Sequence, residues 1–191
     1  MRPAYSDVKL TYDDFVLFPD DGQRHELLDG EHVVTPSPNT KHQDIVANLH
    51  FHIRLWLETR PVGRVFLSPY DIVLSMFDVV VPDLVYFSSE RAAAVLTPKH
   101  AAGAPNLVVE IASPGTRQRD ETIKRRIYER FGVDEYWVVD PELDSVRVFR
   151  RQGERFGRPV ECSMEAGDVL TSPLLPGLDL PLTRVFHQAG A

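Results

Sequence analysis

The stretch VVVPDLVYFS, residues 79–88, places a carboxylate inside a run of large apolar side chains. Such a run is typical of a β-strand that is buried on at least one face. Strict alternation along the strand would point Asp83 to the same side as Val81, Val85 and Phe87. A carboxylate on an apolar face costs free energy unless an arginine, a backbone donor or a metal ion compensates for it. The sequence therefore predicts a compensated acid in the middle of the chain.

The composition is typical of a globular protein. The chain has 191 residues, of which 43% are hydrophobic and 26% charged, so a single domain over residues 1–191 is expected. Because the chain has one cysteine, Cys162, it can form neither an internal disulfide nor a cysteine-based zinc site, and a reducing compartment is favoured.

Signals for secretion or membrane insertion are missing from the sequence. The N-terminal segment has no basic region followed by an apolar one, and no later apolar run reaches transmembrane length. We therefore expect a cytoplasmic protein that does not associate with membranes. The net charge of −7 argues against a general nucleic-acid coating protein, although a local basic surface is compatible with it.

The order of the expected elements predicts an α/β (α+β) fold, in which helices flank a mixed β-sheet. Residues 24–38 around Asp29-Gly30 predict an N-terminal β-hairpin, and residues 39–60 predict a long amphipathic helix. A second helix over residues 117–131 should end at Gly132. A C-terminal strand meander follows, and the proline-rich tail, about residues 171–191, is expected to wrap the surface.

A second acid lies in the strand-like run NLVVEIAS, residues 106–113. By alternation, Leu107, Val109 and Ile111 share one face, and Glu110 points to the other. A single buried acid is more often a loop cap or the partner of an arginine. Two such acids on neighbouring strands favour a bound cation, because like charges cannot share a dry site cheaply.

The helix over residues 117–131 adds a lysine. At about 100° per residue, Ile123 and Ile127 belong to its apolar stripe, and Lys124 and Asp120 fall within the same buried arc. One interpretation is an ion pair between Asp120 and Lys124, with the lysine stem lying along apolar surface. The other is that the helix folds back and aims Lys124 at the carboxyl end of the preceding strand, where Glu110 lies.

Two carboxylates and an ammonium group suit phosphoryl chemistry. Hard oxygen ligands are those that Mg²⁺ prefers, and this ion keeps waters and accepts phosphate oxygens. A bound metal polarises a phosphoryl oxygen and makes a bound water a better nucleophile. A lysine beside it can orient that water or stabilise the developing negative charge.

Three segments together resemble a known family. They are HELLDGEHVVTPSPNTKHQDI (25–45), VPDLVYF (81–87) and PNLVVEIASPGTRQRDETIKRRIYERFGVDEYWVVDP (105–141). They are similar to the bacterial Uma-type family of putative restriction endonucleases, within the PD-(D/E)XK nuclease superfamily. The similarity runs from about residue 10 to residue 149, and it implies the restriction-endonuclease-like fold.

The resemblance also implies roles for particular residues. Asp83 would be the metal-binding aspartate, Glu110 the second ligand, and the backbone carbonyl of Ile111 a third. The superfamily usually places its lysine two residues after the second acid, which is Ala112 here. In this family the lysine stands on the next helix, at the place of Lys124.

Glu26 would be an N-terminal acid that assists the metal or positions water, although it could instead pair with Arg24. Family members often have aspartate at the place of Asn106 and tyrosine at the place of His25, two departures that could tune the site.

The implied activity is that of a Mg²⁺-dependent DNA endonuclease that hydrolyses phosphodiester bonds, with Mn²⁺ as a substitute ion. The alternative is a non-catalytic nucleic-acid-binding or interaction module that keeps the fold. A homodimer is a candidate assembly, since nucleases that cut both strands often act as pairs.

Basic residues gather around the predicted site. Arg117 and Arg119 lie in the segment after Glu110, and Arg125 follows Lys124, so these arginines are candidates for DNA phosphate contacts. Residues 147–158 carry five arginines and one glutamate. This basic run is equally compatible with a charged hairpin edge that discourages aggregation. His42 is a candidate accessory residue near the cleft.

Overall fold

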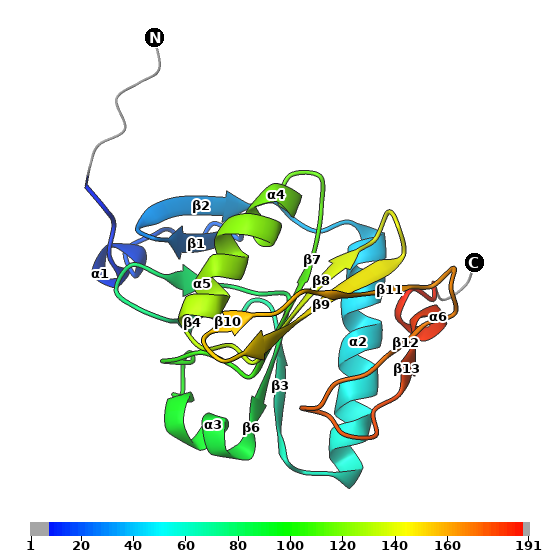
Figure 1. Cartoon of the computed structure of the whole chain (residues 1–191). Helices are drawn as coiled ribbons and strands as arrows, with labels where there is room; N and C mark the ends of the chain where they lie inside the picture. Colours follow the sequence, from blue (N-terminus) through cyan, green and yellow to red (C-terminus); the bar gives the residue numbers. More distant parts are fainter. Residues whose placement is uncertain (1–7, 189–191) are drawn as a thin grey trace.

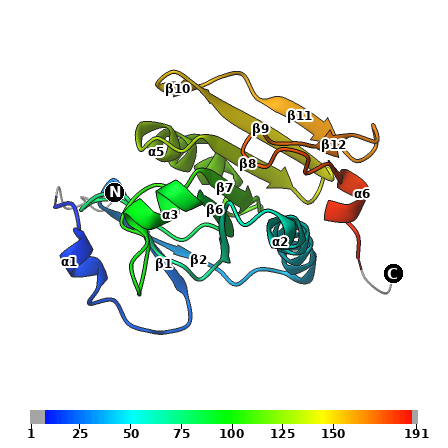
Figure 2. The ribbon, with the colours of Figure 1, turned by 90° about the horizontal axis from the view of Figure 1, so that it is seen from below.

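The computed structural model describes residues 8–188. A mixed β-sheet forms its centre, with helices against both faces (Figures 1 and 2). Its strands run in the order β10-β9-β8-β7-β6-β3, and β11 pairs with β9. The pair β7–β8 is parallel and the other pairs are antiparallel, so the expected mixed sheet flanked by helices is confirmed. The bounds are β3 Gly63–Leu67, β6 Leu84–Ser88, β7 Leu107–Ile111, β8 Glu135–Asp140, β9 Ser145–Gln152, β10 Arg155–Phe156 and β11 Val160–Ser163.

A smaller sheet lies beside the first and contains the N-terminal hairpin. Its strands are ordered β2-β1-β5-β4, with bounds β1 Arg24–Leu28, β2 Glu31–Thr35, β4 Ile72–Val73 and β5 Val79–Val80. The predicted hairpin is confirmed. Asp29 and Gly30 both have positive φ, at 54° and 79°, which is the conformation that a two-residue hairpin turn requires. The short helix α1, Tyr12–Phe15, precedes this sheet.

Residues 79–88 do not form one strand, so the predicted alternation of Asp83 with Val81, Val85 and Phe87 is wrong. β5 belongs to the smaller sheet and β6 to the larger one, and the chain crosses between them at residues 81–83. Proline lacks the N–H group that would continue a strand ladder, and Pro82 stands in this crossing. Asp83 therefore lies at the junction of the two sheets.

Helix α2, Thr40–Thr59, covers one face of the larger sheet (Figure 2). Asn39 is its N-cap, and the side-chain oxygen of Asn39 accepts a hydrogen bond of 2.9 Å from the backbone N–H of His42. The predicted amphipathic stripe is confirmed. Its members are all buried: Ile45, Leu49, Ile53, Trp56 and Leu57.

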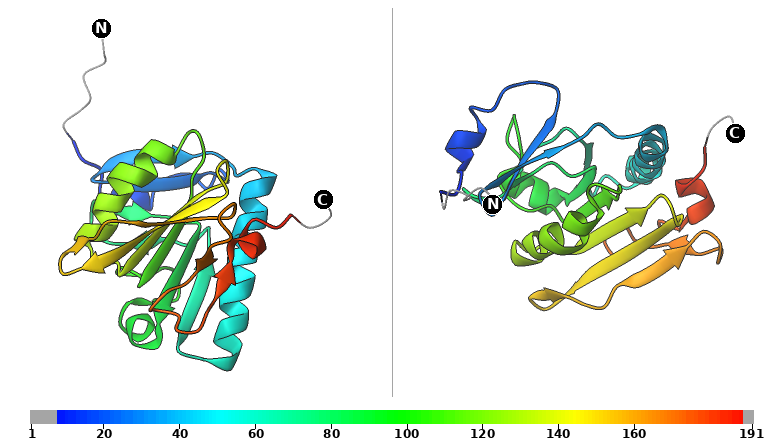
Figure 3. Two further views of the ribbon diagram at one scale, coloured as in Figure 1. Left: turned by 45° about the vertical axis from the view of Figure 1, so that its right-hand side comes forward. Right: turned by 90° about the horizontal axis from the view of Figure 1, so that it is seen from above.

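The C-terminal segment contributes to the same core, so the expected surface-wrapping tail is a wrong prediction. It contains β12 Val169–Leu170, β13 Leu180–Pro181 and helix α6 Leu182–Val185, which lies beside α2 (Figure 3). Leu175, Leu180 and Val185 are at most 2% exposed and pack in one apolar cluster with α2 and the sheet. Apolar residues spaced among prolines bury their side chains here without long regular elements.

Truncating Leu175 to alanine tests this assignment. The variant should lose about 2–4 kcal/mol of unfolding free energy, because the deleted methyl groups leave a cavity in a packed core. The measurement is urea unfolding followed by tryptophan fluorescence. Leu143→Ala is the control, since Leu143 is 71% exposed and should change stability little. Equal stability of both variants would show that the tail does not pack as described.

The opposite face of the sheet carries α3, Ser89–Val95, and a helical arm. The helical arm consists of α4 Arg117–Arg119, a π-helical turn η1 Asp120–Lys124 and α5 Arg125–Arg130. It ends as predicted, with Gly132 at φ 83°. None of the helices between residues 8 and 188 has the length and apolar character to cross a bilayer.

The π turn changes which side chains of the helical arm face the protein. A π turn holds one more residue than an α turn, so it alters the positions predicted by a uniform 100° wheel. Asp120 and Lys124 are buried as predicted, at 2% and 3% exposure. Ile123, predicted in the apolar stripe, is instead 45% exposed. The Tyr136 hydroxyl donates a hydrogen bond of 3.0 Å to the Asp120 carbonyl and supports this irregular backbone.

Candidate nuclease active site

A cavity of about 130 Å³ lies where the two sheets meet the N-terminus of α2 and the helical arm. We call it the central cavity. The walls include Asp83, Glu110, Lys124, Arg119, Asp120 and His42. Three of the four predicted catalytic residues therefore line it, and Glu26 lies directly behind Lys124, 1% exposed.

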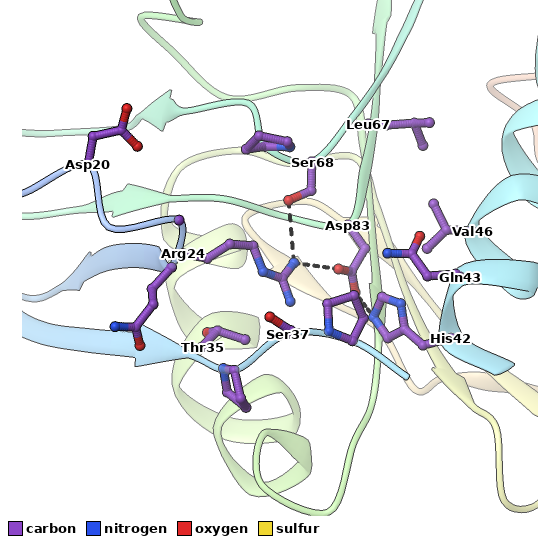
Figure 4. A pocket seen from close by; sticks show the side chains of 15 residues that line it. Asp20, Arg24, Thr35, Ser37, His42, Gln43, Val46, Leu67, Ser68 and Asp83 are labelled. Atoms are coloured by element: carbon purple, nitrogen blue, oxygen red, sulfur yellow. Dashed lines mark hydrogen bonds and ion pairs between the residues drawn. The ribbon is translucent and has the colours of Figure 1, made fainter. Parts of the chain in front are cut away.

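Asp83 is held by three donors at the sheet junction. The Arg24 Nη1 atom lies 2.6 Å from its Oδ1 atom (Figure 4). The Ile111 backbone N–H donates to Oδ2 at 2.8 Å, and His42 Nε2 lies 3.1 Å from the same oxygen. Burial alone would raise the pKa of Asp83, but His42, Arg24 and the Ile111 N–H together hold it below its ordinary value. An arginine, a histidine and a backbone donor thus compensate the buried carboxylate.

Glu110 contacts the helical arm, whereas Ile111 packs in the apolar cluster with α2 on the other face of the sheet, as alternation predicts. Its Oε1 atom accepts hydrogen bonds from Lys124 Nζ at 2.9 Å and from the Tyr128 hydroxyl at 2.6 Å. Burial raises the pKa of Glu110 to about 8, because the nearby Lys124 charge offsets only part of the lost hydration, and other acids oppose ionisation. Glu110 therefore holds a proton more readily than a glutamate in water does.

Lys124 joins two carboxylates from different strands. Its Nζ atom lies 2.9 Å from Glu110 on β7 and 2.7 Å from Glu26 on β1. Burial would lower the pKa of Lys124, but the charges of Glu110 and Glu26 raise it above its ordinary value, so the amine stays protonated. Between residues 8 and 188, no ion pair joins Asp120 to Lys124, so the interpretation of an Asp120–Lys124 pair is wrong.

Glu26 is fixed on the hairpin by backbone and side-chain donors. The Val81 N–H donates to its Oε1 at 2.8 Å, and the Thr35 hydroxyl donates to Oε2 at 3.4 Å. The alternative pairing of Glu26 with Arg24 is not found, because the Arg24 guanidinium pairs with Asp83. Glu26 therefore holds Lys124 together with Glu110.

The three arginines predicted to contact phosphate lie in different surroundings. Arg119 lines the central cavity, and its Nη2 donates to the Thr35 hydroxyl at 3.0 Å. Arg117 pairs instead with Asp140 and Glu142. Arg125 lies over the Phe149 ring, with its guanidinium carbon 5.5 Å from the ring centroid. Arg119 is therefore the one of these three that the fold brings to the predicted site.

Three arginines of the second basic segment contact other parts of the protein. Within the basic run 147–158, Arg147 pairs with Glu121, Arg150 pairs with Glu135, and Arg151 donates to the Val133 carbonyl.

The two departures from the family pattern lie outside the walls of the central cavity. Asn106 accepts from the Ser88 N–H and donates to Asp134, and His25 stacks on His32.

The donors of the central cavity fit Mg²⁺ by their chemistry. Among residues 8–188, no group of three or more histidine, cysteine, aspartate and glutamate side chains is arranged to hold a metal. Mg²⁺ usually keeps several waters and binds through one or two carboxylates, so it does not need such a group. Asp83 and Glu110 both line the cavity and supply two hard oxygen donors.

Sequence reasoning missed two partners of these acids. Tyr128 follows Lys124 by four residues on the helical arm, a spacing that places both side chains on one face, and this signal could have linked it to Glu110. Arg24 pairs with Asp83 across 59 positions of the sequence, and no local pattern indicates such a contact.

Comparison with known proteins agrees with the fold. No curated protein matches the chain. A crystal structure titled as a putative nuclease belonging to DUF820 from Anabaena variabilis superposes with a TM-score of 0.78. It shares 23% sequence identity, over 93% of this chain and 97% of that one, and therefore supports the fold. Residues 12–183 match the Uma2 family model, which is described as "Putative restriction endonuclease". The chain therefore belongs to the Uma2 family.

Proposed function

We propose that this protein is a metal-dependent DNA endonuclease whose active site is the central cavity. Family membership supports a nuclease. The observation that carries the finer proposal is the Lys124 ammonium, 3% exposed, which contacts Glu26 and Glu110 from two different sheets beside the Asp83 carboxylate. A buried lysine fixed by two acids is oriented more tightly than a surface lysine, and it faces a cavity that a phosphate could enter.

Asp83, Glu110 and the Ile111 carbonyl would hold Mg²⁺, with Mn²⁺ as a substitute. When bound, this ion would polarise a phosphoryl oxygen and lower the pKa of a bound water. Glu110 would contribute as a carboxylate after losing its proton, since metal ligands of this kind bind deprotonated. The Tyr128 hydroxyl would keep the Glu110 carboxyl group oriented by its 2.6 Å hydrogen bond.

Lys124 would donate hydrogen bonds to a non-bridging phosphate oxygen or to the attacking water, and it would stabilise the negative charge that develops during hydrolysis. Glu26 would act as a positioning residue, because it touches Lys124 and is itself held by the Val81 N–H. Arg119, at the cavity wall, would contact a phosphate of the DNA strand.

One observation favours the second candidate, a non-catalytic binding module. Both oxygens of Asp83 already have protein partners, as in a structural ion pair. In a nuclease, the metal would have to share or displace the contacts made by Arg24 and His42. The two candidates therefore differ in whether divalent ions bind and whether DNA is cut.

The deciding experiment is cleavage of supercoiled plasmid and of single-stranded DNA with Mg²⁺, with Mn²⁺ and with EDTA. The wild type should cut only with a divalent ion, and Asp83→Asn should reduce the rate by at least about 100-fold. The matched control is Glu135→Gln, a buried acid on β8 that pairs with Arg150 outside the central cavity. This control should retain activity in proportion to its folded fraction.

Thermal unfolding with and without Mg²⁺ supplies a readout that does not depend on hydrolysis, because an ion that binds only the folded state raises its melting temperature. DNA binding without a metal requirement, without cleavage and without a thermal shift would overturn the nuclease proposal in favour of the binding module.

A further inference from the structure

A larger pocket adjoins the central cavity. Its volume is about 340 Å³, and it lies between the end of the hairpin, the start of α2 and the turn after β3 (Figure 4). We call it the side pocket. Arg24, Thr35, His42 and Asp83 line both spaces, so the two hollows share a wall. A ligand bound in the side pocket would therefore lie directly beside the predicted catalytic groups.

The walls of the side pocket are mainly neutral. Val46 and Leu67 supply apolar surface, together with prolines at the ends of the hairpin and of β3. Gln43 and Ser68 add uncharged hydrogen-bonding groups (Figure 4). The Arg24 guanidinium is already paired with Asp83 at 2.6 Å. Such a lining suits a flat neutral heterocycle better than a phosphate group, which would need unpaired cations.

Gln43 has the chemistry to read the edge of a base. A glutamine amide offers one acceptor and a donor pair, which match the hydrogen-bonding edge of adenine. Gln43 is exposed on α2, one position after His42, so its amide is free to reorient at the pocket mouth. The Arg24 Nη1 atom donates hydrogen bonds to the Ser68 hydroxyl at 3.4 Å and to Asp83 at 2.6 Å. Arg24 therefore links a side chain of the side pocket to the predicted metal-binding aspartate.

We propose that the side pocket binds one unpaired nucleobase next to the phosphate that is cut. This inference rests on the function proposed for the central cavity. In a nucleotide the base lies one sugar away from its phosphate, which matches two hollows with a common wall. A base inside a duplex stack cannot enter a pocket, so the preferred substrate is a single strand, a bulge or a similar site with an unstacked base.

Binding by fluorescence anisotropy in EDTA tests the pocket without hydrolysis. The probes are two short labelled duplexes, one with a single bulged adenine and one whose bulged nucleotide lacks its base. Because the phosphate backbones are the same, the difference in affinity reports the base alone. The wild type should bind the bulged adenine about tenfold more tightly.

Two variants on α2 locate the effect. Gln43→Trp fills the pocket mouth and removes the amide, so the preference for the bulged adenine should disappear. Glu58→Trp places the same side chain at an exposed position far along α2 and should keep the preference. Equal wild-type affinities for the two probes would overturn the proposal, and so would a preference that survives in Gln43→Trp.

Adding Mg²⁺ to the same samples separates this inference from the proposed function. Cleavage next to the bulge, faster when the base is present, supports both. If the protein binds the bulged adenine more tightly but cleaves neither duplex, the nuclease proposal is wrong and the base-binding pocket is supported. If the protein cleaves both duplexes at the same rate and binds them with equal affinity, the nuclease proposal is supported and the base-binding pocket is wrong.

Discussion

Replacing Lys124 with methionine should abolish measurable hydrolysis and lower the unfolding free energy by about 3–5 kcal/mol at neutral pH. Methionine keeps most of the side-chain volume but removes the ammonium group that contacts Glu26 and Glu110 at 2.7 and 2.9 Å. Both acids would remain buried without that cation. Urea unfolding and plasmid cleavage measure the two effects separately.

The loss of stability in Lys124→Met should shrink on acidification, because Glu110 then takes up a proton at a smaller cost in free energy and folds in its neutral form. Lys41→Met is the control, since the ion pair of Lys41 with Asp144 is partly exposed and should contribute less than about 1 kcal/mol. A stable Lys124→Met protein at neutral pH would contradict the buried ion pairs. A stable variant with full activity would also remove Lys124 from the proposed mechanism.

The stability of the wild type in EDTA should fall as the pH rises from about 5 to about 8. Glu110 has an ordinary pKa of 4.5, which burial raises to about 8 in the folded protein. Between these values the folded state holds a proton that the unfolded state has released. The stabilisation is therefore complete below 4.5 and is lost as the pH rises through 8. This dependence should amount to a few kcal/mol.

Glu110→Gln isolates the contribution of this group, because glutamine keeps the shape but cannot ionise. Asp120 also has a raised pKa, mainly from burial, and contributes a slope of the same sign, so the difference between wild type and variant is the quantity to measure. Urea unfolding at a series of pH values gives this difference. Parallel curves for the two proteins would mean that Glu110 ionises in the folded state as it does in water.

The parts of the fold that follow local rules were predictable from the sequence. The hairpin follows from Asp29-Gly30, and the stripe of α2 follows from its helical spacing. Two acids on apolar strands and a lysine in a buried arc indicated one shared site, and the structure brings Glu110 and Lys124 together at 2.9 Å. Which side chain pairs with which acid depends on contacts between residues that are distant in sequence. The pairing of Arg24 with Asp83 is one of these.

Three features could not be read from periodicity. The crossing at Pro82 looks like a continuous strand because the apolar pattern persists on both sides of it. The C-terminal segment buries leucines singly between prolines, so no period of 2 or 3.6 residues appears. The π turn adds a residue to a helix whose sequence pattern is otherwise uniform, and this turned Ile123 outward.

The number of residues in the π turn also sets the direction in which Asp120, a residue of the cavity wall, points. Asp120 is the first residue of the π turn and Lys124 is its last. The buried side chains of Ile127 and Tyr128, on α5, form the core-facing half of the helical arm. Deleting the exposed Ile123 would restore α-helical spacing and rotate Asp120 by about 100° relative to that core-facing half. Insertion or loss of a single residue can therefore re-aim an acid at the cavity while the hydrophobic composition of the protein stays the same.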